Sequence, residues 1–301
     1  MAKYLKKFDS HTNYETYIDG DDAILPNVSI CVNNNHVHYN QTEETKIVAI
    51  FNVTTTQYAT TIMNDYEVSV VKELEIDGVI QDNVFGSYVF PTLGEHTVKY
   101  LLENMEKIDY SLFADCQNVI SIYIPNHVKE INNTYFFNGY GLQSIYLPRS
   151  LKVLAIDGSF NSCPNLSNIT VDQRNTVFDS RNNCNALINT DSNTLLVGTL
   201  NTVIPNTIVS IDFEAFEGRN ITSITIPNSV ESIYNRSFQN CTALTSVTVL
   251  ATVPPYTLEE ADLFENTNNC PIYVPAESVN AYKTATGWSD YAERIQAIQT
   301  T

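Results

Sequence analysis

Hydrophobic and polar residues alternate in short runs over the last two-thirds of the chain, and these runs recur. Ile122 and Ile124 flank the polar partner Tyr123, and the same pattern returns at 224–226. Alternation with a period of two predicts a short strand with one buried face and one outward face. A proline follows each of these runs and cannot donate to a continuing ladder, so we expect each strand to end there.

Four stretches repeat the same order of side chains. A strand and its proline are followed by a second apolar pair three residues apart, then by an aromatic residue, a short polar turn and another aliphatic residue. The stretches are SIYIPNHVKEI at Ser121, SIYLPRSLKVL at Ser144, NTVIPNTIVSI at Asn201 and SITIPNSVESI at Ser223. Within each successive pair the prolines lie 23 and 22 residues apart, a period typical of leucine-rich repeats. Such units bury a core only by stacking on their neighbours, which predicts a solenoid.

Three cysteines fall at one position of the polar turn. Cys116, Cys163 and Cys241 lie in ADCQNV, NSCPNL and QNCTAL. We interpret them as a ladder of small buried residues, because a free cysteine usually behaves as a small hydrophobe; a metal or redox site is the alternative. The chain has no CxxC pair and no Cys/His spacing that suggests zinc, so a reduced compartment is expected.

The repeat residues resemble the BspA-like leucine-rich repeats. The resemblance covers residues 105–296 and rests on SITIPNSVESIYNRSFQNCTALTSVTV and on the interruption TVDQRNTVFDSRNNCNALINTDSNTLLVGTLNTVIP. It implies an irregular, hairpin-bearing repeat, and ALINTDSNTLLVG by itself has two apolar runs about a polar turn. The tail resembles the family's C-terminal cap, with a last strand from Ile272 to Val274 and a helix starting near Ala276. The side chains expected over the open end of the core are Tyr282, Trp288, Tyr291 and Ile295.

Residues 46–104 lack the repeat and carry strand-like stretches at 46–54, 67–80, 87–92 and 95–102. Asp77 and Gly78 form a hairpin turn signal. We predict a small antiparallel β-sandwich-like module, similar to the β-module that precedes BspA-like repeats, with 95–102 pairing its edge to the first repeat. The expected fold is therefore mainly β with short helical or irregular connections, a C-terminal leucine-rich-repeat solenoid preceded by this module.

Residues 1–45 form a third segment. Thr12 to Glu15 match a capping box, which predicts a short helix to Ile18 with Tyr14, Tyr17 and Ile18 on one side. The opening of the chain resembles the start of virion proteins, head fibre or tail, of crAss-like Bacteroides phages. The resemblance implies an attachment segment, in which these three residues are the candidate contacts to other virion proteins.

The chain is strongly acidic, with 34 acidic and 16 basic side chains and a formal net charge of -18. This balance argues against nucleic acid as a partner, because phosphate binding depends on clustered Lys and Arg. It also argues against docking on anionic lipids. No apolar run of signal-peptide or membrane-spanning length follows the N-terminal lysines or occurs later. We therefore expect a complete soluble chain, outside the usual export route and without membrane insertion.

Few side chains suggest chemistry. His36 and His38 lie on one side of a strand and suggest a metal site, completed by symmetry if three copies meet on an axis, but an exposed polar strand is the favoured interpretation. Asp172, Asp179 and Asp191 in the irregular repeat are candidates for a glycosidase pair, although an acidic protein supplies many accidental pairs. The chain has no GxSxG, P-loop or GxGxxG motif. We predict no enzyme activity, no metal and no cofactor.

Tyr123, Tyr146, Thr225 and Thr248 alternate with the buried strand positions, so they are the candidate partner-binding residues; the alternative is that they only cover the sheet. We predict a structural virion protein of a Bacteroides phage, anchored by residues 1–45 and displaying the solenoid to a host cell-surface protein or glycan. The alternatives are a BspA-like adhesin on a bacterial cell surface and, less favoured, a polysaccharide-degrading tail component. Fibres form symmetric homo-oligomers, so a trimer or dimer through the N-terminal half is expected.

Overall fold

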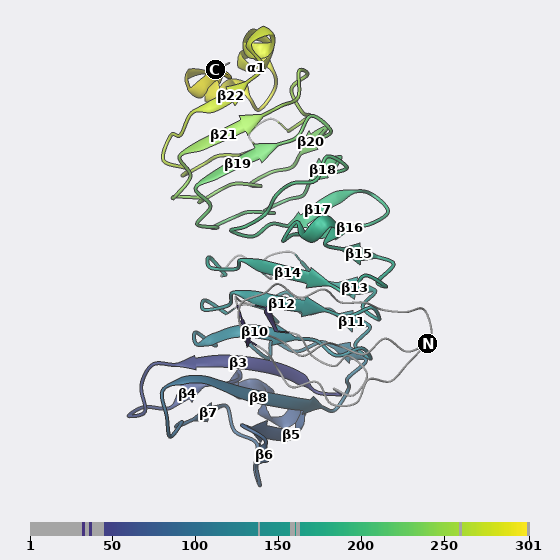
Figure 1. Ribbon diagram of the computed structural model, residues 1–301, viewed down its shortest axis with the longest axis vertical. Coiled ribbons are helices and arrows are strands. Elements are labelled where there is room, and N and C mark those ends of the chain that lie inside the picture. Colours follow the sequence, from purple (N-terminus) through teal and green to yellow (C-terminus); the bar gives the residue numbers. More distant parts are fainter. Residues whose placement is uncertain are drawn as a thin grey trace.

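A computed structural model describes residues 45–137, 139–156, 160, 163–258 and 261–299, with the backbone of 32–33 and 36–37. The fold is mainly β, a solenoid preceded by a small antiparallel sheet, as the sequence predicts (Figure 1). β1 (Val32–Asn33) and β2 (His36–Val37) form an antiparallel pair. The predicted helix with Tyr14, Tyr17 and Ile18, and the side chains of the possible histidine site, lie outside the described residues.

The main sheet of the solenoid has two parts, stacked along the long axis of the molecule (Figure 1). Its parallel strands are β10 (Val119–Tyr123), β12 (Ser144–Leu147) and β14 (Asn168–Val171), then β19 (Ser223–Ile226), β21 (Ser246–Val249), β22 (Ile272–Val274) and β23 (Ile295–Ala297). Ser121 pairs with Ser144, and Ser223 pairs with Ser246. Equivalent residues of successive repeats therefore lie side by side, as the repeat alignment requires.

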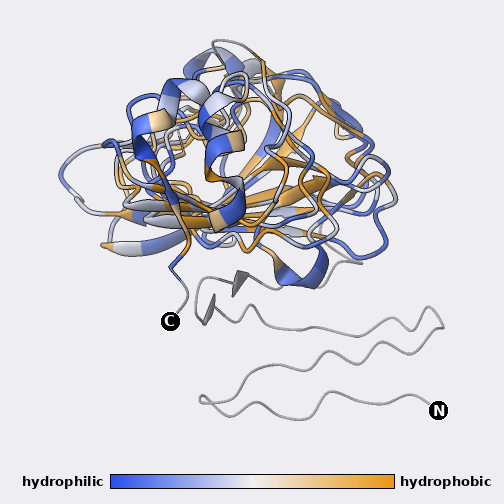
Figure 2. Ribbon diagram, turned by 90° about the horizontal axis from the view of Figure 1, so that it is seen from above, coloured by the Kyte–Doolittle hydropathy of each residue, from blue (hydrophilic) through white to orange (hydrophobic). Residues whose placement is uncertain are grey.

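A second ladder of short strands runs along the flank of the coil. It consists of β9 (Lys107–Ile108), β11 (Glu130–Ile131) and β13 (Val153–Leu154), then β15 (Phe178–Asp179), β16 (Leu187–Asn189), β17 (Thr194–Val197), β18 (Ser210–Ile211) and β20 (Ser232–Ile233). The predicted second apolar pair of each repeat points inward here, and Val128 and Ile131 are both fully buried. Figure 2, a view along the long axis, shows hydrophobic residues inside the coil and hydrophilic residues around it.

The third side of the coil holds a row of stacked aromatic rings. The ring of Phe238 stacks on Phe216 with centroids 5.0 Å apart and on Phe264 at 5.3 Å. Cys241 Sγ donates to the Phe216 carbonyl at 3.0 Å, and burial raises the pKa of this thiol to about 12. All described cysteines are free and buried, and the predicted ladder of Cys116, Cys163 and Cys241 is confirmed as part of the core.

The N-terminal module extends the first part of the main sheet. Its strands are β3 (Ile47–Val53), β8 (Gly94–Leu102), β5 (Val71–Ile76) and β6 (Val79–Ile80), and the sheet order is β14-β12-β10-β3-β8-β5-β6. β4 (Thr60–Thr61) and β7 (Ser87–Tyr88) form a separate antiparallel pair. One hydrophobic core extends from Ile47 to Val197, so the predicted boundary at 104/105 falls within a continuous core.

The predicted pairing of 95–102 with the first repeat is wrong, because β3 lies between β8 and β10. The outward residues of the two strands differ. On β3, Val48 and Ile50 are apolar and only 1% and 5% exposed. The corresponding positions of β8 include Glu95 and Lys99, which remain at least partly in contact with solvent.

Part of the predicted strand at 67–80 is helical. The 3-10 helix η1 (Asp65–Val70) precedes β5, and the Asn64 side chain caps it by accepting from the Tyr66 amide. The Glu67 carboxylate accepts from the backbone N–H and the hydroxyl of Ser111, which ties this turn to the first repeat. The predicted Asp77-Gly78 turn is confirmed, with φ of 49° and 82°.

The irregular repeat divides the core in two. Its predicted hairpin is confirmed as β16 and β17, which pair antiparallel. Leu187 and Val197 pack into the N-terminal core, whereas Ile188 and Leu195 pack into the C-terminal core. Successive residues of a strand point to opposite faces of the sheet. A hairpin that lies between two cores therefore needs apolar residues on both of its faces.

A buried arginine also spans this division. Arg219 is 1% exposed and lies in the turn that follows Phe216, in the C-terminal half of the solenoid. Its Nη1 donates to the Phe160 carbonyl at 2.7 Å, and its Nε donates to the Gly198 carbonyl at 3.1 Å. Burial lowers the pKa of this guanidinium from its ordinary value. The two halves are therefore joined by charge-assisted hydrogen bonds as well as by the hairpin.

The C-terminal cap closes the second core as predicted. β22 has the predicted bounds, and helical turns begin at Ala276 with η3 (Ala276–Ser278), α1 (Val279–Thr284) and η4 (Ser289–Arg294). Tyr282, Trp288 and Ile295 are at most 2% exposed, and Tyr291 is half-buried with its hydroxyl 3.1 Å from the Phe264 amide. The last residues add an unpredicted strand, β23, which pairs in parallel with β22.

Candidate binding surface

The outer face of the C-terminal sheet carries two of the predicted partner-binding residues. Thr225 on β19 is exposed and Thr248 on β21 is partly exposed, and they are direct neighbours in the parallel register. Thr248 pairs in turn with Tyr273 on β22, and Tyr273 pairs with Gln296 on β23. We call these four side chains the outer row. Sequence reasoning missed Tyr273 and Gln296. The signature could have found Tyr273, because Val274 and Pro275 follow it as Ile124 and Pro125 follow Tyr123, whereas no proline follows the strand that holds Gln296.

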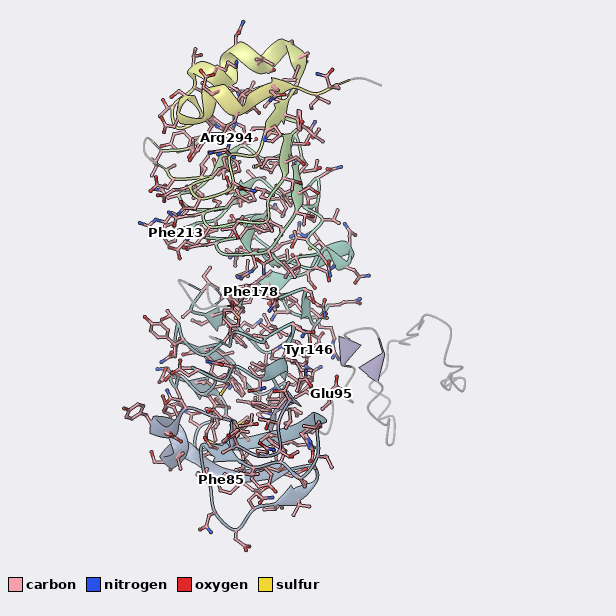
Figure 3. All side chains as sticks on the ribbon, turned by 90° about the vertical axis from the view of Figure 1, so that its left-hand side faces the viewer. Phe85, Glu95, Tyr146, Phe178, Phe213 and Arg294 are labelled. Atoms are coloured by element: carbon pink, nitrogen blue, oxygen red, sulfur yellow. The ribbon has the colours of Figure 1, made fainter. Side chains whose placement is uncertain are left out.

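The other two predicted residues lie in a different environment. Tyr123 lies on the outer face of β10, as alternation predicts, but it is only 2% exposed and so offers little surface to a partner. Its ring stacks on Tyr146 with centroids 5.0 Å apart, and across the antiparallel pair its neighbour is the buried Val48. Tyr146 is half-buried, and burial raises its pKa well above the ordinary range. In Figure 3, Tyr146 and Glu95 lie on one side of the molecule and Phe213 on the other.

Asp172, one of the predicted carboxylates, is held by its own chain neighbour. Its two oxygens accept from Arg174 Nε at 3.1 Å and Nη2 at 3.0 Å, and Tyr146 Oη donates to it at 3.1 Å. Burial acts to raise the pKa of this carboxyl, but the hydrogen bonds from Arg174 outweigh it and hold the pKa below the ordinary value. Asp172 therefore stays ionised.

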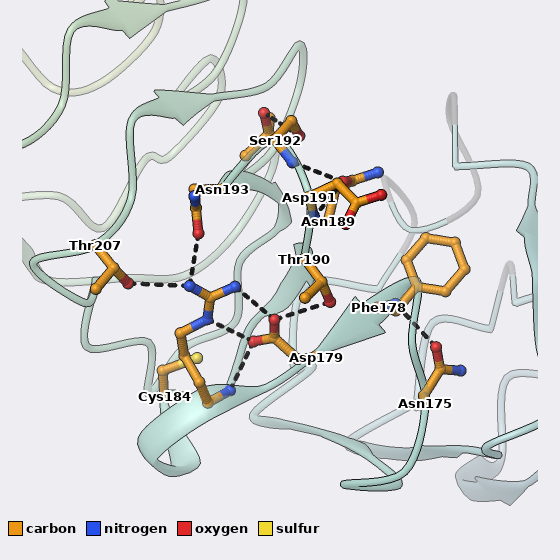
Figure 4. A network of polar contacts seen from close by, with 12 residues as sticks. Asn175, Phe178, Asp179, Cys184, Asn189, Thr190, Asp191, Ser192, Asn193 and Thr207 are labelled. Atoms are coloured by element: carbon orange, nitrogen blue, oxygen red, sulfur yellow. Dashed lines mark hydrogen bonds and ion pairs between the residues drawn. The ribbon is translucent and has the colours of Figure 1, made fainter.

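Asp179 repeats this arrangement in the same irregular repeat (Figure 4). Arg181 donates to its two oxygens from Nε at 2.8 Å and from Nη2 at 2.6 Å, and Thr190 Oγ1 donates at 3.0 Å. The Arg181 Nη1 reaches Asn193 Oδ1 at 2.6 Å and Thr207 Oγ1 at 3.2 Å. Here too burial raises the pKa less than the hydrogen bonds from Arg181 lower it. The network ties β15 to the hairpin and to the next repeat.

Asp191 lies exposed in the turn of the hairpin, where its amide donates to Asn189 Oδ1 at 3.2 Å. A glycosidase needs one carboxyl that keeps its proton near neutral pH. Asp172 and Asp179 both have lowered pKa values and full sets of hydrogen bonds. The geometry assigns these two side chains to holding the irregular repeat together.

Sequence reasoning also missed a group of exposed apolar residues on the flank. Phe213, Tyr234, Tyr256 and Leu258 are 41%, 40%, 59% and 45% exposed and follow successive rungs of the second ladder. The Arg236 guanidinium lies 5.9 Å from the centroid of the Phe213 ring. These four residues do not recur at one position of the repeat. The sequence pattern therefore does not single them out.

Within the described ranges, the structure contains no group of three or more His, Cys, Asp or Glu side chains placed to hold a metal ion. In the same part of the chain, no helix combines the length and the apolar character needed to cross a membrane.

The fold and its recurring rungs define a leucine-rich-repeat solenoid. The sequence profile of the family described as BspA type leucine rich repeat region matches residues 80–193 and 197–284, with six copies. This match covers more than half of the chain, and the chain belongs to that family. A search of curated proteins found no match.

Three solved structures are similar to parts of the chain. A leucine-rich repeat protein from Eubacterium ventriosum is 22% identical over 52% of this chain and 48% of its own, with a TM-score of 0.38. A leucine rich cell surface protein from Faecalibacterium prausnitzii is 17% identical over 62% and 61%, with a TM-score of 0.36. The pneumococcal vaccine antigen PcpA is 13% identical over 57% and 60%, with a TM-score of 0.34. The matched region spans less than two-thirds of each of these chains.

Proposed function

We propose that this chain is a non-enzymatic adhesin, which binds a cell-surface protein or glycan through the outer face of its C-terminal sheet. The observation that carries the proposal is the placement of Thr225 and Thr248, which are adjacent in register, one exposed and one partly exposed on the outer face of the sheet. A rigid solenoid suits this role because it presents an extended surface without needing a catalytic pocket.

The ionised, arginine-bound carboxylates support a binding role over a catalytic one. Both carboxylate oxygens of Asp172 and of Asp179 accept hydrogen bonds from a neighbouring arginine. Neither side chain therefore carries the proton that a general acid would donate in cleaving a glycosidic bond. A polysaccharide-degrading role would need other residues, and no described feature favours it.

We place this activity at a bacterial cell surface, the setting expected for a BspA-like adhesin. The more specific placement in a virion depends on residues 1–45, most of which lie outside the described residues. None of the structures reported above is described as a phage protein. Attachment through Tyr14, Tyr17 and Ile18 therefore stays a prediction, and labelling of intact particles with an antibody to the solenoid would test it.

The adhesin proposal is tested by retention of the purified full chain on intact cells. We would measure binding of labelled chain to gut Bacteroides cells and to mucin-producing human epithelial cells. The variant Thr225→Arg/Thr248→Arg places two charged, bulky side chains on the outer row. A matched control is Thr242→Arg, since Thr242 is an exposed threonine in the turn beyond Cys241.

We expect retention on at least one of these surfaces, loss of most of it in the double variant, and no change in the control. Thermal melting of each variant, followed by circular dichroism, shows whether the fold is intact. Retention that is unaffected by the double variant, or no retention on either surface, would overturn the proposal.

A further inference from the structure

The outer face of the C-terminal sheet carries no charge. Its six outward side chains on β19, β21, β22 and β23 are all uncharged, namely Ser223, Thr225, Ser246, Thr248, Tyr273 and Gln296. The whole chain has 34 acidic and 16 basic side chains. The outward residues of β10, β12 and β14 are uncharged as well, but most of them are buried, with Ser121, Tyr123, Ser144 and Asn168 at most 8% exposed. The C-terminal sheet is therefore the part of the solenoid where the neutral face is more accessible.

The other end of the molecule shows the contrast. The outer face of the N-terminal module carries a cluster of ion pairs, in which Lys46 Nζ lies 2.6 Å from both Glu73 Oε1 and Glu75 Oε2. Lys99 Nζ approaches Glu75 Oε1 at 3.8 Å. The same sheet surface is therefore charged at one end of the chain and only hydroxyl- or amide-bearing at the other.

The outer row runs along the solenoid axis with one side chain on each rung. Thr225, Thr248, Tyr273 and Gln296 are consecutive register partners, so they repeat at the spacing of neighbouring strands, about 4.8 Å. Hydroxyl and amide groups both donate and accept hydrogen bonds. The Tyr273 ring adds an apolar face with a polar tip. A partner with its own repeat, rich in hydroxyls and lying across the strands, matches this row.

We propose that the ligand of this face is an uncharged polysaccharide whose extended chain runs along the solenoid axis, with one sugar ring over each rung. This inference rests on the proposed function, because it names the partner of the same face. The sugar hydroxyls exchange hydrogen bonds with Thr225, Thr248 and Gln296, and the C–H face of one ring lies on Tyr273. One sugar ring of an extended chain is about as long as the strand spacing.

The charges of the chain disfavour charged partners. A net charge of -18 repels anionic glycans and nucleic acids, and the outer row offers no cation to offset that repulsion. A basic protein surface would need carboxylates, and the outer row has none. An uncharged ligand pays no such electrostatic penalty.

The test is affinity electrophoresis of the full chain through gels that contain one polysaccharide each. Hydroxyethylcellulose and carboxymethylcellulose form a matched pair, since they share a backbone and differ in charge. Glucomannan and arabinoxylan extend the neutral set, and alginate extends the anionic set. The variants are Thr248→Ala, Tyr273→Ala and the control Thr242→Ala, with circular dichroism to check folding.

We expect retardation by at least one neutral polysaccharide and none by carboxymethylcellulose or alginate. The apparent dissociation constant should rise roughly fivefold in Thr248→Ala and roughly tenfold in Tyr273→Ala, with no change in Thr242→Ala. Binding should be the same at low and high salt, because a neutral ligand has no ion pair to screen.

Two kinds of result would overturn the inference. One is the absence of retardation by every neutral polysaccharide tested, and the other is stronger retardation by the anionic set. If Thr225→Arg/Thr248→Arg still abolishes cell retention in either case, the binding face stands and only its ligand class is wrong. If that variant retains cell binding, the proposed function itself fails.

Discussion

One position of the repeat donates a hydrogen bond to the rung before it. Cys163 Sγ reaches the Phe137 carbonyl at 2.9 Å, and Cys241 Sγ reaches the Phe216 carbonyl at 3.0 Å. Arg219 follows Phe216 at the same offset at which Cys241 follows Phe238. The arginine also bonds to the preceding phenylalanine carbonyl, that of Phe160. The longer side chain is needed because the irregular repeat separates these rungs.

Replacing Arg219 should be costly. In Arg219→Met the carbonyls of Phe160 and Gly198 lose charge-assisted donors inside the core, so the free energy of unfolding should fall by about 3 kcal/mol. Arg236→Met is the control, because that side chain is half exposed and pairs with Glu214 at 3.6 Å; its loss should cost no more than about 1 kcal/mol. Urea denaturation measures both. Equal effects would contradict the spanning role of Arg219.

The two aspartates of the irregular repeat should control stability in acid. The folded protein lowers the pKa values of both carboxyl groups. Their contribution to the free energy of unfolding is therefore fully present above the unfolded-state pKa, about 4, and is lost as the pH falls through the folded-state pKa values. We expect stability to vary little with these groups between pH 7 and 5 and to drop below pH 4. Asp179→Asn should be less stable at pH 7 and show a smaller acid loss. The measurement is the urea midpoint of unfolding as a function of pH. A midpoint that falls in acid as steeply in this variant as in the unchanged chain would contradict the assignment.

The ladder thiols should resist alkylation in the folded protein. Cys116, Cys163 and Cys241 are fully buried, and burial raises the pKa of each thiol. At pH 8 iodoacetamide should leave these three unmodified until denaturant is added, as read by peptide mass spectrometry. Rapid labelling of any one of them in the native chain would show that the core is open there.

At the scale of elements, the hairpin β16–β17 is the piece that differs most from a regular repeat. Its apolar residues are adjacent rather than alternating, as in Leu187-Ile188, and this pattern is what a strand buried on both faces requires. The sequence therefore predicts a hairpin within 186–198. It does not predict that two separate cores meet on it, because that depends on contacts between residues far apart in the chain.

Two matched substitutions test this double-sided packing. Leu187 and Leu195 are both fully buried but belong to the N-terminal and C-terminal cores respectively. Each leucine-to-alanine change should cost about 2–5 kcal/mol. Leu187→Ala should speed amide exchange in β10 and β12, whereas Leu195→Ala should speed it in β19 and β21. Hydrogen exchange that rises equally across both halves in both variants would contradict a division of the core.

The sequence predicts where strands lie better than it predicts which strands pair with each other. The repeats specify their own register, since Ser121, Ser144 and their equivalents must align for the coil to stack. The order β10-β3-β8 has no such internal rule, because it depends on pairing between segments that lie far apart in the chain. Likewise, alternation predicts that Tyr123 lies on the outer face of β10, but not that its ring stacks on Tyr146 or that the side chain is only 2% exposed.

For the whole molecule, one further prediction concerns assembly. Val79, Ile80, Val89 and Leu93 in the N-terminal module are 53–64% exposed, and β6 is the edge of its sheet. Exposed apolar groups at a sheet edge favour self-association. We expect a dimer or trimer through this half, dissociated by Val79→Lys/Leu93→Lys. Light scattering after size exclusion measures the mass, and a monomer at high micromolar concentration would contradict the expectation.

The outer face of the C-terminal sheet is the central claim, and protection by a bound surface tests it most directly. Hydroxyl-radical footprinting of the full chain on isolated envelopes of cells that retain it reports on two tyrosines, with no variant needed. Tyr273 lies in the outer row, and Tyr256 lies 59% exposed on the flank. We predict that binding protects Tyr273 from oxidation and leaves Tyr256 unchanged. Protection of Tyr256 with full oxidation of Tyr273 would contradict the account and move the binding surface to the flank.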